Sequence, residues 1–325
     1  MYFCIDTSYT IFYRFHALQT WAGLALKDSS DTETERAIQA KFREKYLETM
    51  LNICKKIYIE SRKGEIEKEG EGEGREEEGM EVEGMEGEGM EEEGREKGRT
   101  LKKKAKKIKF NQEEHTFLWC RDTDRSTLWR TELFPEYKGN RQNDTGVGSF
   151  FSDTYQNILG PFIEANPNHH LLRLERLEAD DMIYLTCKHL VETRGEDYTH
   201  IAIVTSDYDL LQIKKLESPN HRISFWKCQK GGSHWTGKSD DPDFDLFCKI
   251  IGGDPSDNIK SCFKGVGKKT IQKLFKDQSL FDTHLAKSEE GKNQYLLNKT
   301  LIDFRNIPEH YQLSALAQIK SVLER

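Results

Sequence analysis

The sequence predicts an α/β fold, in which a central sheet has helices on both faces and a smaller helical region follows. Short apolar runs alternate with amphipathic helices through most of the chain, and the alternation stops near residue 244. The composition also breaks at residues 61–109, where a Glu/Gly repeat leads into a basic block. Because that segment has too little apolar surface to form a core, we expect a disordered insertion there. The expected divisions are an α/β core (1–60 and 110–243), the insertion (61–109) and a helical region (244–325).

Each element is predicted from its own pattern. Five short apolar runs indicate strands at residues 1–5, 116–120, 171–174, 201–205 and 222–226. Residues 39–59 place apolar side chains at three- and four-residue steps, which is typical of a helix. A second amphipathic helix is expected over residues 179–192, ending at Gly195.

The composition excludes several classes of protein. The 325 residues are 36% hydrophobic and 32% charged, with no apolar run long enough for a membrane span and no charged-then-apolar leader. The 7 cysteines are scattered without a CxxC pair, which argues for a reducing compartment and against zinc or a disulfide framework. We therefore expect a globular intracellular protein without a membrane partner.

Acidic side chains follow the predicted strands. Four of them come just beyond an apolar run: Asp6, Asp122, Glu178 and Asp207. In an open α/β sheet the carboxyl ends of the strands form the edge where ligands bind. Further acids crowd the same places, namely Asp180, Asp181 and Asp209, and a downstream turn carries Asp254 and Asp257. A helix cap or an acidic first turn explains one or two such residues, but not a set that converges on one edge.

Converging carboxylates stay ionised together only when cations neutralise them. Ligation by oxygen without histidine or cysteine selects a hard ion, Mg²⁺ or Mn²⁺. Two such ions serve phosphoryl transfer by activating a water and stabilising the leaving oxygen. The acids therefore predict phosphodiester hydrolysis.

Six segments follow one another in a recognisable order: D…YR at 6–14, D…WR at 122–130, FPEYKGNR at 134–141, EADD at 178–181, SDYDLLQ at 206–212, and GDPSDNI followed by GVGKKT at 253–270. With these segments the sequence resembles the 5′-nuclease superfamily of flap endonucleases and 5′→3′ exonucleases, and is most similar to its stand-alone bacteriophage-type members. The resemblance covers nearly the whole chain except the insertion. It implies a PIN-like nuclease core and a helical C-terminal helix-three-turn-helix region that binds DNA.

The resemblance also implies roles for individual residues. The first Mg²⁺ would be served chiefly by Asp6, Asp122, Glu178 and Asp180. The second would be served by Asp181, Asp207, Asp209, Asp254 and Asp257, some of them through waters. Lys138 and Arg14 would act on the scissile phosphate, and DNA would also contact Arg130, Tyr137 and Arg141. Asp124 is an alternative to Asp122, and the short glycine-bearing stretch after Lys138 predicts a reduced or mobile arch.

A basic glycine turn is the expected contact to duplex DNA, formed by Gly265, Gly267, Lys268, Lys269 and Thr270. Glycines let the backbone approach a phosphate, and the N–H groups at the next helix start can hold it. The resemblance adds K⁺ at this turn. The net charge of −7 does not argue against DNA, because the nine proposed metal-site acids account for more than all of it.

The expected function is removal of 5′ flaps or RNA primers and 5′→3′ degradation of DNA in replication or repair, by a monomer working beside a separate polymerase. Alternatives are a relative that cuts four-way junctions, a non-catalytic protein that binds branched DNA, and an RNA-cleaving PIN-domain enzyme. The balance between flap and exonuclease activity stays open at this point.

Overall fold

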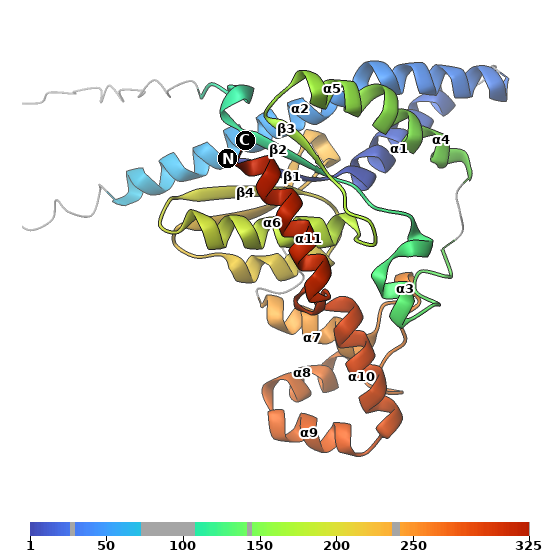
Figure 1. Ribbon diagram of the computed structural model, residues 1–325, viewed down its shortest axis with the longest axis vertical. Coiled ribbons are helices and arrows are strands. Elements are labelled where there is room, and N and C mark those ends of the chain that lie inside the picture. The colour runs from blue at the N-terminus through green and yellow to red at the C-terminus, as the bar shows by residue number, and fades with distance from the viewer. Residues whose placement is uncertain (27–29, 73–107, 142–144, 236–240, 325) are drawn as a thin grey trace, which may run out of the picture.

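The computed structural model describes residues 1–26, 30–72, 108–141, 145–235 and 241–324 (Figure 1). Most of the predicted insertion at 61–109 lies outside these ranges. Within them the predicted α/β fold is confirmed: a six-stranded mixed sheet is flanked by helices.

The sheet has the strand order β3-β2-β1-β4-β5-β6. Its strands are β1 (Tyr2–Asp6), β2 (Thr116–Cys120), β3 (His169–Leu172), β4 (Thr199–Val204), β5 (His221–Lys227) and β6 (Ser233–Trp235). The first five pair in parallel, and only β6 runs antiparallel, against β5. Because helices cover both faces, the parallel strands are buried almost throughout and read as continuous apolar runs.

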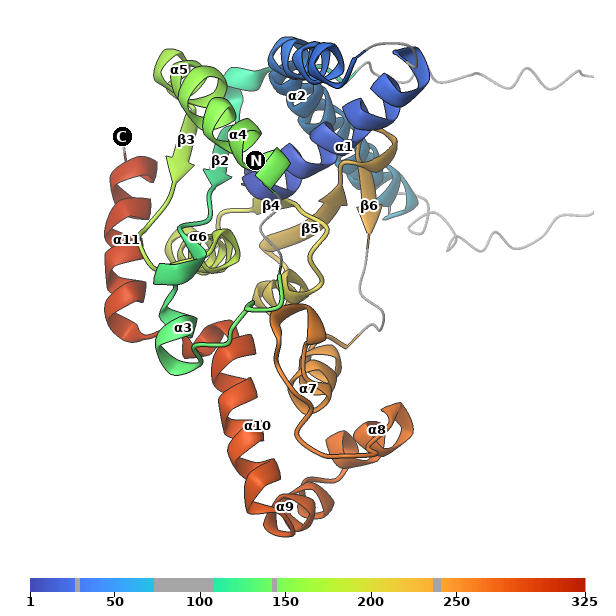
Figure 2. The ribbon, with the colours of Figure 1, turned by 90° about the vertical axis from the view of Figure 1, so that its right-hand side faces the viewer.

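Two layers of helices enclose the sheet (Figures 1 and 2). On one face α6 (Ala179–Arg194) packs on the strands and α11 (Glu309–Leu323) packs on α6. The other face carries α1 (Thr7–Ala25), α2 (Asp31–Gly72), α4 (Thr145–Asp153) and α5 (Gly160–Ala165). The segment predicted as a reduced arch is thus helical from residue 145 onward.

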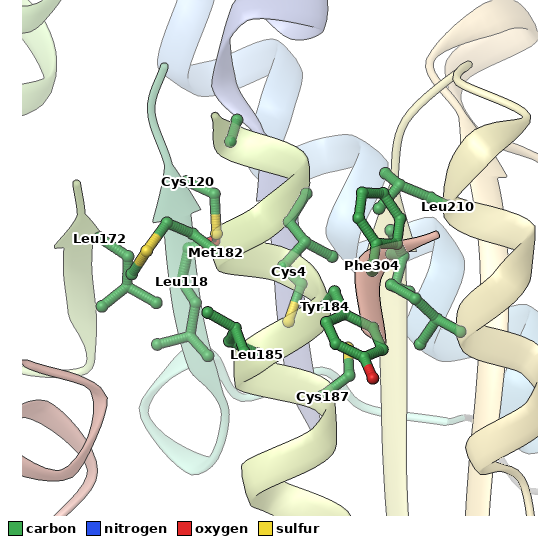
Figure 3. Close-up of a cluster of buried hydrophobic side chains, with 14 of the residues drawn as sticks. Cys4, Leu118, Cys120, Leu172, Met182, Tyr184, Leu185, Cys187, Leu210 and Phe304 are labelled. Carbon is green, nitrogen blue, oxygen red and sulfur yellow. Dashed lines mark hydrogen bonds between the residues drawn. The ribbon is translucent and has the colours of Figure 1, made fainter. Parts of the chain in front are cut away.

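Strand alternation divides the core between these layers. Cys4 and Leu118 point toward α6, where they meet Met182 and Leu185 (Figure 3), whereas Phe3 and Phe117 point toward α1 and α2. The same alternation decides which side chains beyond the strand ends face each layer.

Helix α2 continues to Gly72, past the boundary predicted at residue 60. Glutamate and lysine favour helix in this stretch, and Glu65 links this part of α2 to the rest of the α/β core. The Glu65 carboxylate pairs with Arg62 in the same helix, accepts from the Tyr198 hydroxyl at 3.0 Å, and pairs with Arg222 of β5 at 3.4 Å.

The C-terminal part is helical, as predicted. Its helices are α7 (Pro242–Gly252), α8 (Lys268–Lys276), α9 (Gln278–Ala286) and α10 (Glu289–Ile302). They surround a small core of their own that includes Ile251, Phe263, Leu274 and Phe281. The chain then returns to the body, because α11 packs on α6 and β3 (Figure 2).

Short segments complete the chain between these elements. They are α3 (Trp129–Leu133), the π-helix η4 (Thr154–Leu159), and the 3₁₀-helices η2 (Gln112–Glu114), η3 (Arg125–Thr127), η5 (Asp209–Leu216), η6 (Gln229–Gly231), η7 (Pro255–Asp257) and η8 (Phe304–Asn306). In the described ranges, none of the helices has the length and apolar character that a bilayer span requires.

Candidate active site

The predicted acids gather at the edge of the sheet where β1, β2 and β4 end. A cleft of about 1630 Å³ opens there, lined by Asp6, Asp122, Glu178, Asp180, Asp207, Asp209 and Asp254. Asp257 lines a small adjoining void together with Glu178 and Asp180. Parallel strands bring their carboxyl ends to one edge, so strands far apart in the sequence deliver acids to one cleft.

Four of the acids have no cation within ion-pair distance among the described residues; these uncompensated acids are Asp6, Asp122, Asp180 and Asp207. Neutral donors hold three of them in place, and Asp207 accepts from the Asp209 amide at 2.8 Å. Asp6 caps α1 by accepting from the Tyr9 amide at 3.0 Å, and it also accepts from the Thr205 hydroxyl at 3.0 Å. Asp122 accepts from the Ala179 amide at 2.9 Å and from the Ser8 hydroxyl.

Burial and mutual repulsion act on these acids. Burial, with the charge of Asp122 next, raises the pKa of Asp6 to about 7. Burial also raises the pKa of Asp180 well above its usual range, and the charges of Asp207 and Asp6 add to this shift. At both acids burial and the neighbouring carboxylates act in the same direction, and no cation lies close enough to form an ion pair that would oppose them.

The donor set fits a hard divalent cation, because the uncompensated acids offer only carboxylate oxygens. In the ranges that the structure describes, no three acidic, histidine or cysteine side chains are yet close enough to hold a metal ion between them. Like charges in a partly buried cleft repel one another, so we expect these carboxylates to draw together only around a cation.

Four further acids are paired with fixed cations; these paired acids are Glu178, Asp209, Asp254 and Asp257. Lys138 pairs with Glu178, and Arg141 pairs with Asp257. Lys249 bridges the remaining two, with its Nζ 2.8 Å from Asp254 and in contact with Asp209.

Burial and the paired cation act in opposite directions on the pKa of Glu178, Asp209 and Asp254. Burial alone would raise the pKa of Glu178, but Lys138 and Arg130 outweigh it and hold the pKa at about 2. For Asp209 burial prevails over Lys249 and raises the pKa to about 7. At Asp254 burial is again opposed by Lys249, and here the pKa is lowered.

Asp181 and Arg130 do not lie where they were predicted. Asp181 is 0% exposed and Arg130 is 3% exposed, and their side chains pair with each other through two hydrogen bonds of 2.8 and 2.7 Å. The Trp129 indole N–H also donates to Asp181, at 3.2 Å. Consecutive helix positions point about 100° apart, so Asp180 faces the cleft while Asp181 faces the interior. The prediction of Asp181 as a metal ligand and of Arg130 as a DNA contact is therefore corrected to a buried ion pair.

Tyr137 and Arg14 also need correction. Tyr137 is 5% exposed, and its hydroxyl lies 2.9 Å from Glu178 and 3.1 Å from Asp257, so it orients these acids and is not available to DNA. Arg14 lies on α1 and does not line the cleft. Eight helical residues separate it from Asp6, a rise of about 12 Å, which carries it away from the acids.

Lys138 and Arg141 do line the cleft, as predicted. Lys138 has a left-handed backbone with φ of 55°, a strained conformation for a non-glycine residue, and its amide donates to the Asp257 carbonyl at 3.0 Å. Asp124 also lines the cleft, but its carboxylate is engaged as the cap of η3, where it accepts from the Ser126 amide at 2.9 Å. Asp122 is therefore the aspartate that belongs to the site.

The basic glycine turn lies beside the cleft. Gly265 has φ of 75°, a conformation that favours glycine, and α8 begins at Lys268 after Gly267. Lys268 lines the cleft, and Lys269 and Thr270 are exposed next to it.

Sequence reasoning missed two residues that hold the site together. Lys249 bridges two acids, but a lysine in the last turn of a helix is ordinarily explained by the helix dipole. Ser8 donates to Asp122 from the first turn of α1, and only its position two residues after Asp6 could have indicated it.

Comparison with known proteins agrees with this arrangement. Residues 98–233 match a family model described as the 5′-3′ exonuclease, N-terminal resolvase-like domain. Ribonuclease H of Enterobacteria phage T4 is 26% identical over 232 residues, covering 64% of this chain and 69% of that protein.

Solved structures show a similar fold. The crystal structure of the T5 D15 protein co-crystallized with metal ions aligns with a TM-score of 0.54 at 16% identity, covering 99% of this chain and 98% of that one. The bacteriophage T5 D15 flap endonuclease in complex with DNA and metal ions aligns with a TM-score of 0.46 at 18% identity, over 65% and 84% of the two chains. These likenesses are to phage-type members of the 5′-nuclease superfamily: residues 98–233 match the exonuclease domain model, and the phage T4 relative is similar over 64% of this chain.

Proposed function

We propose that this protein is a structure-selective 5′-nuclease that hydrolyses DNA phosphodiesters with divalent metal ions. The observation that carries the proposal is the group of uncompensated acids in a cleft that also presents Lys138 and Arg141. A cleft with carboxylates for cations and fixed cations for phosphate suits a reaction between a water molecule and a phosphodiester.

The uncompensated acids would hold one Mg²⁺, or Mn²⁺ in its place. Asp209 and Asp254 both pair with Lys249. They would bind a second ion, which would replace the lysine ammonium as their positive partner. When bound, such ions lower the pKa of a water and neutralise charge on the leaving oxygen. The chain itself holds the carboxylates in position through Ser8, Thr205 and the Tyr9 and Ala179 amides.

Lys138 would hold an oxygen of the scissile phosphate. Burial lowers the pKa of its ammonium, but Glu178 and Asp257 outweigh burial and raise the pKa, so Lys138 stays charged at neutral pH. A permanently charged lysine donates hydrogen bonds and cannot act as a general base. Arg141 would contact a neighbouring phosphate in the same way, because its guanidinium lines the cleft and is half-exposed.

The helices α7 to α10 would bind the duplex as a helix-three-turn-helix region. Its glycine turn and the N-terminus of α8 can approach a phosphate, and Lys268 and Lys269 add charge at the same place. K⁺ bound at this turn would strengthen the contact. These contacts read the backbone, so binding should depend on DNA structure and weaken steeply with salt.

The biological role proposed here is removal of 5′ flaps or RNA primers in replication or repair, by an intracellular monomer beside a separate polymerase. The phage T4 relative carries the name ribonuclease H, which supports testing RNA-primed substrates.

The test is cleavage of a 5′-labelled flap duplex in Mg²⁺, in EDTA, and by Asp207→Ala in Mg²⁺. We expect cutting near the junction by the native protein in Mg²⁺ alone, and none by the variant. Asp124→Ala is the matched control, since it removes an exposed carboxylate that lines the same cleft but is engaged as the cap of η3. Flaps with an RNA 5′ segment and four-way junctions compare substrate classes. Tight binding without cutting in Mg²⁺ or Mn²⁺ would reject the nuclease in favour of a branched-DNA-binding protein.

A further inference from the structure

Two arginines of the cleft, Arg121 and Arg125, have no carboxylate within ion-pair distance among the described residues, and Arg125 is engaged by the Arg141 carbonyl at 3.1 Å. Arg121 follows directly after β2, and strand alternation turns it toward the same face as Trp119, on the side of α4 and η4. Its amide donates to the Leu172 carbonyl at 3.0 Å, which fixes the backbone. Its side chain lines the cleft beside Asp122.

A tyrosine ring holds this guanidinium in place. The Arg121 Cζ lies 3.8 Å from the centre of the Tyr155 ring, which leaves the N–H groups at the guanidinium edge directed away from the ring. In the described part of the chain, no carboxylate lies within ion-pair distance of Arg121. By contrast, Arg130 and Arg141 are both engaged by acids.

Tyr155 supplies a second donor without a partner. It also lines the cleft and is only 8% exposed, and its hydroxyl forms no hydrogen bond of full geometry among the described residues; its nearest polar neighbour is the Ser8 hydroxyl, which donates to Asp122. A buried hydroxyl is ordinarily satisfied, so an unsatisfied one that faces a cleft indicates a missing ligand. The residue lies in the π-helix η4, a type of segment found often at functional sites.

The charges along the sheet edge indicate the direction of a bound strand. Three of the uncompensated acids lie at or just beyond the ends of β4, β1 and β2, and α8, which begins at Lys268, lies on the side of β5 (Figure 2). On the opposite side, toward β3, the cleft is lined by Arg121 and Arg173. A strand whose duplex part rests on α8 would therefore pass the acids and continue to Arg121.

We propose that Arg121 and Tyr155 form a phosphate-binding site for the single strand on the 5′ side of the cut. Two unpartnered donors that converge without an acceptor suit a phosphodiester oxygen, and a guanidinium matches phosphate with two parallel hydrogen bonds. The inference rests on the proposed function, because the direction of the strand comes from it.

The experiment measures binding, so that it does not depend on cleavage. Fluorescence anisotropy in Ca²⁺ gives the Kd of flap DNAs that carry one neutral methylphosphonate linkage, moved in turn along the 5′ strand from the junction. The native protein is compared with Arg121→Gln and with Tyr155→Phe, which keeps the ring and removes only the hydroxyl. Arg194→Gln is the matched control, because Arg194 also lies over a tyrosine ring, that of Tyr2, at the opposite end of β1.

We expect one linkage whose neutralisation weakens native binding about tenfold. Arg121→Gln should bind unmodified DNA about tenfold more weakly, ignore that linkage, and lower the salt slope by about one. Tyr155→Phe should show a smaller loss at the same linkage, and Arg194→Gln should match the native protein. The inference is overturned if Arg121→Gln and Tyr155→Phe keep the native sensitivity at every linkage, or bind as tightly as the native protein. Failure to cleave would count against the nuclease alone, and the binding comparison would still decide this site.

Discussion

The uncompensated and the paired acids share one cleft, but only the paired acids have a positively charged side chain beside them. Each paired acid has a lysine or arginine against it, so that half of the site is close to neutral before any ligand arrives. Each uncompensated acid has only neutral donors or other acids, and the pKa of Asp6 and of Asp180 is raised as a result.

The difference separates stability from function. Paired acids contribute to the fold, since losing one leaves a buried cation without its partner. Uncompensated acids destabilise the fold until a cation binds, and groups that cost stability without serving the fold are typical of an active site. The sign of the stability change on neutralising one acid should therefore report which half it belongs to.

The largest expected effect is that of Asp180→Asn on cleavage. The variant removes a central donor of the uncompensated acids, so we expect the cleavage rate of a flap duplex in Mg²⁺ to fall by at least about 100-fold. In EDTA the same variant should be more stable than the native protein, by about 1 kcal/mol, because one repelling charge is gone. Urea unfolding in EDTA measures this.

Asp124→Asn serves as the control, since its carboxylate is exposed and caps a short helix. It should retain native cleavage. If Asp180→Asn were less stable than the native protein in EDTA, the charge of Asp180 would already be balanced by a positive charge. The distinction between uncompensated and paired acids would then be wrong.

Asp257→Asn should have the opposite effect on stability. The charge of Asp257 balances Arg141, and its carboxylate also lies 3.1 Å from the Tyr137 hydroxyl. Its loss leaves the half-exposed Arg141, and the more buried Lys138 whose Nζ lies 3.9 Å from Asp257, with less compensating charge, so we expect about 1 kcal/mol of destabilisation in EDTA. Denaturant unfolding beside Asp180→Asn compares the two directly, and stabilisation by both substitutions would contradict the comparison.

The sequence predicts the positions of the uncompensated acids better than it predicts the ion pairs of the paired acids. The uncompensated acids follow from strand ends and strand order, because parallel strands leave few ways to place Asp6, Asp122 and Asp207. The pairing of the other half depends on which helix face meets which loop. Lys249 reaches Asp209 across forty residues of chain, and no local pattern marks that contact.

The same limit explains the errors. The motif EADD does not distinguish Asp180 from Asp181, and only the packing of α6 against Trp129 and Arg130 turns the second aspartate inward. Five of the six strands were predicted within a few residues because their apolar runs are buried on both faces, whereas the three-residue edge strand β6 was missed. The extension of α2 to Gly72 was missed because its contacts with Tyr198 and Arg222 are tertiary.

A smaller effect concerns pH. Burial and Asp122 raise the pKa of Asp6 from 3.8 to about 7, so the folded protein keeps a proton that the unfolded chain releases between these values. The stability that this proton gives the folded protein is present below pH 4 and is lost as the pH rises to about 7, where a cation can replace the proton. We expect Mg²⁺ to stabilise the protein by about 2 kcal/mol more at about pH 8 than at about pH 5.5.

Thermal unfolding with and without Mg²⁺ at each pH measures this difference. The buried His169 and His200 have lowered pKa values, to about 4 and about 3, and their contribution to stability is lost as the pH falls. The histidines contribute equally with and without Mg²⁺ at a given pH, so their contribution cancels in the difference between the two measurements. An equal effect of Mg²⁺ at both pH values would mean that protons and cations do not compete for the uncompensated acids.

The smallest effect comes from the backbone, and it leaves both groups of acids intact. A Cβ on Gly160 would lie 2.8 Å from the Tyr155 carbonyl oxygen, closer than real contacts allow, so Gly160→Ala must shift η4. We expect the free energy of unfolding of Gly160→Ala to fall by about 1 kcal/mol, and we expect this variant to bind the 5′ strand of the DNA more weakly. Gly23→Ala is the matched control, because its Cβ meets nothing within 4 Å on α1 and alanine should stabilise that helix by about 0.5–1 kcal/mol. If Gly160→Ala were as stable as the control and bound DNA normally, the π-helix would not be what positions Tyr155. The Mg²⁺ response of Gly160→Ala should remain native in either case, since neither acid group lies on η4.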